Sequence, residues 1–150
     1  MNGFDYRTVP LVGIHRVEAA AGTGKTFSLA LLFLRMIISG IPADKILAVT
    51  FTNAATDELK SRIRHFLILA LNVLNHQPIE NPEIESLILQ SGIDSNIVQS
   101  GLRYGLDHFD ELSIYTIHSF CYRILRDYPF ETHGRFNAEL INDQTSLLEE

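Results

Sequence analysis

The stretch EAAAGTGKT, at positions 18–26, combines small residues with one cation and one hydroxyl group. Small residues let consecutive backbone N–H groups curl around a phosphate, which larger side chains would obstruct. The Lys25 ammonium can reach the β- and γ-phosphates of a nucleotide, and the Thr26 hydroxyl is a suitable Mg²⁺ ligand. We therefore predict a phosphate-binding loop in which Lys25 and Thr26 are the catalytic residues. Its nucleotide-binding residues are Ala19, Ala20, Ala21, Gly22, Thr23, Gly24, Lys25 and Thr26.

The alternative explanation for this stretch is a glycine turn beside a chance lysine. Ala19 stands where the phosphate-loop pattern usually has its first glycine, and roughly one chain of this length in a hundred would match by accident. The match, however, lies between an apolar run that predicts a strand and a run that predicts a helix. Phosphate binding at a helix N-terminus requires that context. The pattern favours a bound nucleoside triphosphate without indicating how its energy is used.

Composition and charge limit the other possibilities. The chain has 150 residues, of which 46% are hydrophobic and 20% charged, as in one ordinary globular domain. Its net charge of −6 argues against a generic nucleic-acid coat, because nonspecific phosphate binding needs clustered Lys and Arg. Cys121 is the one cysteine, so a reducing cytoplasm is the expected location. No secretory signal is evident and no apolar run approaches the ~20 residues that span a bilayer, so no membrane association is expected.

Strand and helix patterns alternate along the chain. Continuous apolar runs predict buried strands, and each is followed by a helical pattern. Strands separated by helices favour a parallel sheet with crossover connections. We therefore predict an α/β fold with a parallel sheet of at least three strands and helices on both faces. The predicted strands are Ile14–Ala19, Ile46–Thr52 and Leu112–His118.

The helix boundaries follow from capping residues and helix breakers. The longest predicted helix contains Glu58 and Arg62 as an i,i+4 pair, and its basic cluster of Lys60, Arg62 and Arg64 is most simply a solvated face. The predicted helices run from Gly24 to about Ser39, from Thr52 or Asn53 through Leu74, as two shorter helices between Pro82 and about Asp110, and from Ser119 to Tyr128.

Polar and aromatic residues stand where the second and third predicted strands end. Phe51, Thr52 and Asn53 follow one strand, and Thr116 and His118 end the other. Ligands bind at the carboxyl edge of open α/β sheets, and a single-strand groove would use a stacking ring with hydrogen-bonding neighbours. Alternatively, Thr52 or Asn53 merely caps a helix and His118 is a boundary histidine with satisfied hydrogen bonds. From spacing alone, the capping alternative is favoured, although both interpretations are compatible for Asn53.

Three segments, taken together, resemble the first motor domain of superfamily 1 DNA helicases of the UvrD type, and most of all the RecB branch. The segments are TVPLVGIHRVEAAAGTGKTF, which resembles the Walker A region, VTFTNAATDELKSRI, which resembles motif Ia, and YTIHSFCYRIL, which resembles motif Ib. The resemblance implies a RecA-like P-loop NTPase fold, of which residues 1–150 would be an incomplete N-terminal part of motor domain 1A. It places the end of the chain at the start of the helical insertion.

The resemblance also implies ligands and partners. Residues 19–26 would hold ATP and Mg²⁺, with Thr26 as the metal ligand. The five strand-end residues would border a track for single-stranded DNA; they are Phe51, Thr52, Asn53, Thr116 and His118. Complete relatives couple ATP hydrolysis to movement along DNA. RecB-type relatives add a nuclease and act with RecC- and RecD-like subunits in recombinational double-strand-break repair.

Three features depart from the helicase pattern. Val12 stands where many relatives have a glutamine that reads adenine, and Ala54 stands where the UvrD branch usually has lysine, in agreement with the RecB branch. Phosphoryl transfer also needs an acidic pair at the end of an apolar strand, whereas Asp110 and Glu111 precede one. We therefore expect no activity from the 150-residue chain alone. The alternative function is a noncatalytic P-loop module that binds a nucleotide or a partner.

Overall fold

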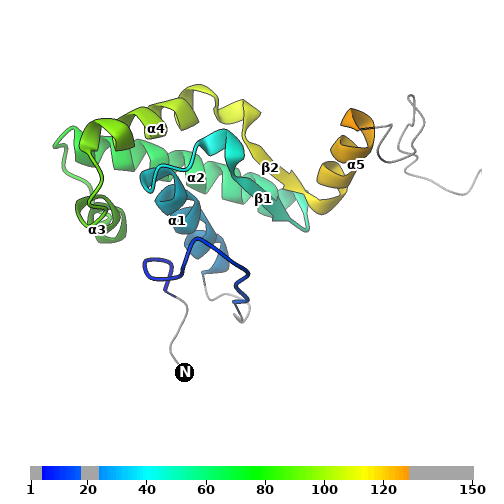
Figure 1. Ribbon diagram of the computed structural model, residues 1–150, viewed down its shortest axis with the longest axis horizontal. Helices are drawn as coiled ribbons and strands as arrows, with labels where there is room; N and C mark the ends of the chain where they lie inside the picture. Colours follow the sequence, from blue (N-terminus) through cyan, green and yellow to red (C-terminus); the bar gives the residue numbers. More distant parts are fainter. Residues whose placement is uncertain (1–4, 18–23, 129–150) are drawn as a thin grey trace, which may run out of the picture.

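The computed structural model describes residues 5–17 and 24–128 (Figure 1). Helices and strands alternate in these residues, which confirms the α/β class. In chain order the elements are α1 (Lys25–Ile38), the 3₁₀ turn η1 (Ala43–Lys45), β1 (Leu47–Thr50), α2 (Asn53–Leu74), α3 (Pro82–Leu89), α4 (Ser95–Asp107), the 3₁₀ turn η2 (Phe109–Glu111), β2 (Ser113–Thr116) and α5 (Ile117–Asp127).

The sheet of the described residues has two parallel strands, with Leu47 of β1 opposite Ser113 of β2 and Thr50 opposite Thr116. The crossover between them contains α2, α3 and α4. Both strands are shorter than predicted, because the residues after Thr50 turn to enter α2 and α5 begins at Ile117.

The prediction of a third strand over residues 14–19 is wrong for the residues that the structure describes. Residues 14–17 form no strand, Ile14 is fully exposed and Val17 is about half exposed. Residues 18 and 19 lie outside the described ranges. A strand depends on a neighbouring backbone for its hydrogen bonds, so an apolar run predicts a strand only where such a neighbour is present.

The two faces of the sheet differ in burial. Ile114 and Thr116 are buried on the face that packs against α2, whereas Leu47 and Val49 alternate to the opposite face and are exposed. In the described part of the chain, helices therefore cover one face of the sheet more completely than the other. The second face is covered only in part, by α5 at the carboxyl end of the strands, whose Arg123 lies over the ring of Tyr115 opposite Val49 (Figure 1).

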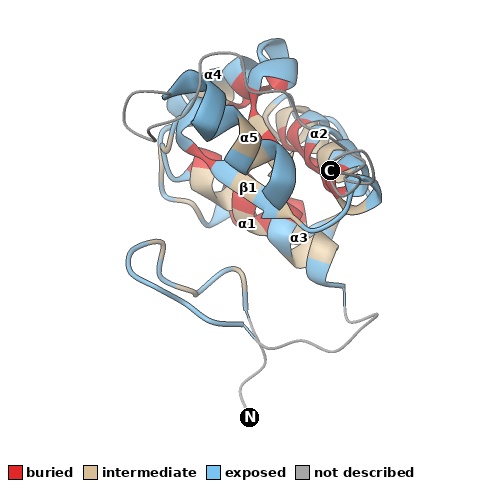
Figure 2. Ribbon diagram, turned by 90° about the vertical axis from the view of Figure 1, so that its right-hand side faces the viewer, coloured by how far each residue is buried: buried red, intermediate tan, exposed pale blue. Residues whose placement is uncertain are grey.

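The hydrophobic core lies mainly between helices, where α1 packs on α2 and α4 packs on both (Figure 2). Gly105 of α4 faces this core, where a Cβ would make ordinary van der Waals contacts with the Cβ of Ala43 at 3.5 Å and the Cδ1 of Leu67 at 3.6 Å. No helix of the described residues is long and apolar enough to cross a membrane. The largest fully buried side chains are Leu31, Leu34, Ile38, Ile63, Leu67, Ile84, Val98, Leu102 and Ile114.

Candidate functional site

The first candidate site is the N-terminus of α1. Gly24 adopts a left-handed conformation with φ of 78°, in which a side chain would be strained, and Lys25 begins the helix. The first helical hydrogen bond runs from the Ser28 N–H to the Gly24 carbonyl oxygen at 2.9 Å. Lys25 and Thr26 are therefore the first two residues of the helix, as a phosphate-binding loop requires. Residues 19–23 of the predicted loop lie outside the described residues.

The start of α1 differs from the other helix starts of the described residues. The four remaining α-helices are each preceded by a residue whose side chain accepts a hydrogen bond from a first-turn N–H: Thr52, Asn81, Asp94 and Thr116. Gly24 has no side chain that could do this, and the first turn of α1 contains no acidic residue. A helix N-terminus of this kind suits an anion, so the residues present fit a nucleotide phosphate.

The residue types at this end of α1 also fit Mg²⁺. The ion prefers oxygen ligands and is usually held by one or two protein groups together with substrate phosphates and water. Thr26 supplies a hydroxyl group of that kind. Among residues 5–17 and 24–128, no group of three or more His, Cys, Asp and Glu side chains could hold a metal ion by itself.

The second candidate site is the carboxyl edge of the two strands. Phe51 follows β1 and is 75% exposed, and His118 is exposed in the first turn of α5. Their ring centroids lie 6.5 Å apart, with an angle of 64° between the ring planes. Thr52 and Asn53 are exposed beside Phe51 at the start of α2. The structure thus brings four of the five predicted DNA-binding residues to one exposed edge.

Thr116, the fifth predicted residue, is only 7% exposed. Its Oγ1 accepts a hydrogen bond from the Ser119 N–H at 3.1 Å and donates to the Ser119 Oγ at 2.9 Å. Thr52 similarly accepts from the Ala55 N–H at 3.1 Å. The capping alternative is therefore confirmed for Thr52, whereas the capping role of Thr116 was not predicted. Because Thr52 is exposed, its side chain remains accessible to a ligand while it caps α2.

A small hydroxyl network fixes the turn that carries Phe51. The Thr50 Oγ1 lies 2.6 Å from the Thr56 Oγ1, and the Thr56 hydroxyl donates to the Thr52 carbonyl oxygen at 3.1 Å. Thr56 is 6% exposed, so these bonds are shielded from water. The network ties the end of β1 to the first turn of α2. It therefore holds Phe51 outward, at the edge of the sheet.

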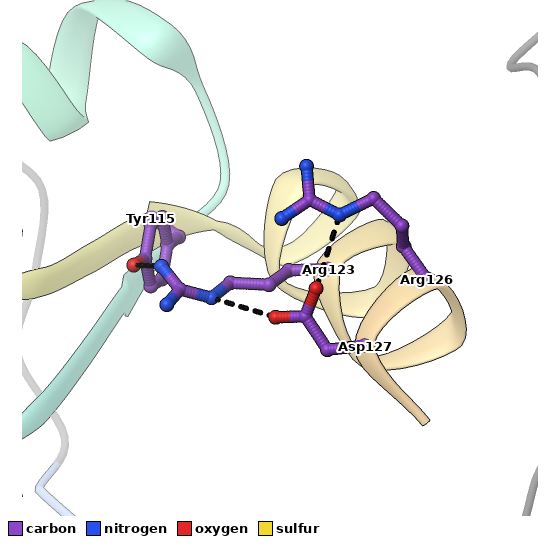
Figure 3. Close-up of polar contacts among 4 residues, drawn as sticks. All are labelled: Tyr115, Arg123, Arg126 and Asp127. Carbon is purple, nitrogen blue, oxygen red and sulfur yellow. Dashed lines mark hydrogen bonds and ion pairs between the residues drawn. The ribbon is translucent and has the colours of Figure 1, made fainter. Parts of the chain in front are cut away.

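Polar contacts position α5, which has no buried residue (Figures 2 and 3). The Arg123 Nη1 donates a hydrogen bond to the Tyr115 hydroxyl, and the Arg123 Cζ lies 5.3 Å from the centroid of the Tyr115 ring. The Asp127 carboxylate accepts from the Arg123 Nε at 3.2 Å and from the Arg126 Nε at 3.0 Å. These contacts were not predicted, because they depend on the angle between β2 and α5.

The basic cluster on α2 is not the uniform solvated face that was predicted. Arg62 forms the predicted ion pair with Glu58, at 3.1 Å, but its Cζ also lies 5.8 Å from the centroid of the Phe27 ring on α1. Arg64 is exposed and lies over the ring of Phe109. The contact between Arg62 and α1 was not predicted from the sequence. Helical periodicity shows that a residue lies at the edge of the buried face, but it does not show which other helix that residue contacts.

An arginine of α1 anchors the N-terminal segment. The Arg35 Nη1 donates to the Tyr6 carbonyl oxygen at 2.9 Å and to the Val9 carbonyl oxygen at 2.5 Å. Val12, which the resemblance places where many relatives have glutamine, is 85% exposed. The segment before the predicted loop is thus fixed to the helix that follows the loop.

Comparison with known proteins identifies the relatives of this chain. The sequence pattern of the UvrD/REP helicase N-terminal domain matches residues 7–150. The RecBCD enzyme subunit RecB of Haemophilus influenzae is 36% identical over 94% of this chain, and that of Escherichia coli is 34% identical over 93%. The Chlamydia pneumoniae subunit is 41% identical over 75% of the chain. The chain spans only 13%, 12% and 11% of the length of these three relatives.

Proposed function

Because this chain belongs to the UvrD/REP helicase N-terminal domain family, we propose that it is the ATP-binding segment of an ATP-dependent DNA helicase. Its similarity to RecB subunits of the RecBCD enzyme extends the proposal to a helicase–nuclease subunit in recombinational double-strand-break repair. The parent protein would act on single-stranded DNA and assemble with RecC- and RecD-like subunits. ATP and Mg²⁺ would be its cofactors.

The observation that carries this proposal is the start of α1. Gly24 is left-handed, Lys25 and Thr26 open the helix, and no acidic residue lies in its first turn. A nucleotide phosphate would be held by the helix N-terminus and by the Lys25 ammonium, and Thr26 would contribute an oxygen ligand to Mg²⁺. Bound Mg²⁺ would neutralise phosphate charge during transfer. Residues 19–23 would complete the cradle.

The exposed edge with Phe51 and His118 supports the DNA part of the proposal. Both rings are accessible, and Thr52 and Asn53 add hydrogen-bonding groups next to Phe51. Aromatic rings at a sheet edge can stack on bases of any type, which suits a motor that moves along DNA without reading its sequence.

The alternative, a noncatalytic nucleotide- or partner-binding module, is favoured by one observation. In the described residues neither strand ends in a carboxylate, since β1 ends at Thr50 and β2 at Thr116. Asp110 and Glu111 lie in η2, before β2 begins. The described part of the chain therefore has no carboxylate at a strand end that could position the attacking water.

Calorimetry with Mg·ADP tests the proposed nucleotide site on the 150-residue chain. Lys25→Ala should weaken binding by on the order of 2 kcal/mol, because it removes a charge-assisted contact to phosphate. The matched control is Lys45→Ala, because Lys45 is also a lysine but lies in η1, where it pairs with Asp44 at the surface. Equal affinities for the wild-type chain and Lys25→Ala would contradict the site assignment.

A further inference from the structure

Phe27 connects the proposed nucleotide end of α1 with α2. It directly follows Thr26 in the first turn of α1, and its ring packs edge-on against the Phe66 ring with 5.4 Å between centroids. The Arg62 guanidinium lies over the same Phe27 ring at 5.8 Å. Because Arg62 and Phe66 are four residues apart on α2, they face Phe27 side by side. The first turn of α1 thus rests on two neighbouring side chains of α2.

Arg62 is held in a defined orientation between water and the protein interior. Its Nη2 donates to the Glu58 carboxylate at 3.1 Å, and its side chain is 36% exposed. Its Nε is buried and has no acceptor among the residues that the structure describes. A buried donor of this kind is unfavourable, so the position is unlike that of a solvated surface arginine. The ring of Phe27 and the Glu58 carboxylate are the two contacts that orient it.

The same helix provides a comparison for this arginine. Arg64 also lies over an aromatic ring, with its Cζ 5.3 Å from the centroid of Phe109, but it is exposed and Phe109 belongs to η2. The two arginines therefore share charge, helix and type of ring contact. They differ in that Arg62 contacts the first turn of α1.

We propose that Arg62 is a positioning residue for nucleotide binding, because it holds the first turn of α1 in place through Phe27. The inference rests on the proposed function, since it assumes that Lys25 and Thr26 bind phosphate. Arg62 also connects the proposed nucleotide end of α1 to the helix whose N-terminus carries Thr52 and Asn53.

The test compares Mg·ADP affinities of variants of the 150-residue chain, each measured at a temperature where circular dichroism shows it fully folded. Arg62→Met keeps the length and apolar stem of the side chain but removes the guanidinium. It should weaken binding roughly 3- to 30-fold, the usual range for residues that act through a neighbour. Arg64→Met should stay within about twofold of the wild-type chain, since it makes the same chemical change away from α1.

A double-mutant cycle separates positioning from a general loss of stability. Phe27→Leu removes the ring face but keeps an apolar side chain, and it should weaken Mg·ADP binding in the same range as Arg62→Met. Once Phe27 is leucine, Arg62→Met should have little further effect, because the two residues act as one unit. Additive losses in the double variant would overturn the proposal. If Arg62→Met does not fold, the Mg·ADP affinity of Phe27→Leu becomes the test. An affinity for Phe27→Leu equal to that of the wild-type chain would then overturn the proposal.

The outcomes also distinguish this inference from the proposed function. If Lys25→Ala loses affinity while Arg62→Met does not, the role of Arg62 is wrong and the nucleotide site stands. If Lys25→Ala binds Mg·ADP as well as the wild-type chain, the site assignment fails and the role of Arg62 fails with it. An equal loss in Arg62→Met and Arg64→Met would show a general effect of charge on α2 and would overturn the proposal.

Discussion

The Phe51 ring lies edge-on to the His118 ring, with 6.5 Å between their centroids and 64° between their planes. The two residues follow different strands and come together because β1 and β2 are parallel, with Thr50 opposite Thr116. Their contact makes one continuous aromatic edge from two separate segments of sequence. A single-stranded nucleic acid that lay along this edge would meet both rings.

This arrangement predicts that both rings contribute to binding of single-stranded DNA. Phe51→Ala and His118→Ala should each weaken binding by about 1–3 kcal/mol, the usual contribution of a base–aromatic stack. Fluorescence anisotropy with an unstructured oligonucleotide at low salt measures the effect. Binding should also fall as salt rises, because phosphate contacts release counterions.

A control variant separates the edge from general surface hydrophobicity. Leu89 on α3 is 73% exposed, close to the 75% of Phe51, so Leu89→Ala removes a similarly exposed apolar side chain elsewhere. Its DNA affinity should equal that of the wild-type chain. Equal losses for Leu89→Ala and Phe51→Ala would show that the edge has no special role.

The capping role of Thr116 predicts that its hydroxyl group stabilises the folded chain. Its hydroxyl caps α5, and the residue is 7% exposed, so Thr116→Ala should lower the free energy of unfolding by about 1–2 kcal/mol. Thr116→Ser keeps the hydroxyl and should retain most of the capping. Urea denaturation followed by circular dichroism measures both variants. A Thr116→Ser variant as unstable as Thr116→Ala would mean that the methyl group, and not the cap, is what matters.

The contact between Tyr115 and Arg123 predicts that the Tyr115 hydroxyl stabilises α5 against local unfolding (Figure 3). Tyr115→Phe removes the hydrogen-bond acceptor but keeps the ring beneath the guanidinium, so α5 should lose about 1 kcal/mol of local stability. Amide hydrogen exchange in α5 should become faster by about fivefold, and the rest of the chain should be unchanged. Tyr104→Phe makes the same chemical change on α4 and should leave exchange in α5 as it was.

Local signals made the helices predictable. Thr52, one of the two predicted capping residues, precedes α2, which begins and ends where its pattern predicted, at Asn53 and Leu74. The caps of the three later helices were not predicted; they are Asn81, Asp94 and Thr116. These signals depend only on neighbours along the chain. The parallel pairing of β1 and β2 was also predicted and is confirmed, because alternating strands and helices favour crossovers.

Features that depend on distant partners could not be predicted. The apolar run at residues 14–17 shows a strand pattern but lacks a strand in the structure, because pairing depends on a partner backbone. The partial burial of Arg62 depends on the position of Phe27 in another helix, and the position of α5 depends on the contact between Tyr115 and Arg123. Such contacts depend on how the elements pack in space, and residue types and their spacing along the chain carry little information about that packing.

The last prediction is that the 150-residue chain alone shows no meaningful ATPase activity, even with single-stranded DNA present. Lys25 and Thr26 can hold phosphates, but hydrolysis also requires a group that positions water and completes the Mg²⁺ shell. In the described residues β1 and β2 end in threonine, and Asp110 and Glu111 lie before β2. A coupled ATPase assay on the wild-type chain, with Lys25→Ala as control, measures this. DNA-stimulated turnover that disappears in Lys25→Ala would show that a catalytic carboxylate is present after all. Asp110→Asn and Glu18→Gln would then be the first variants to identify it.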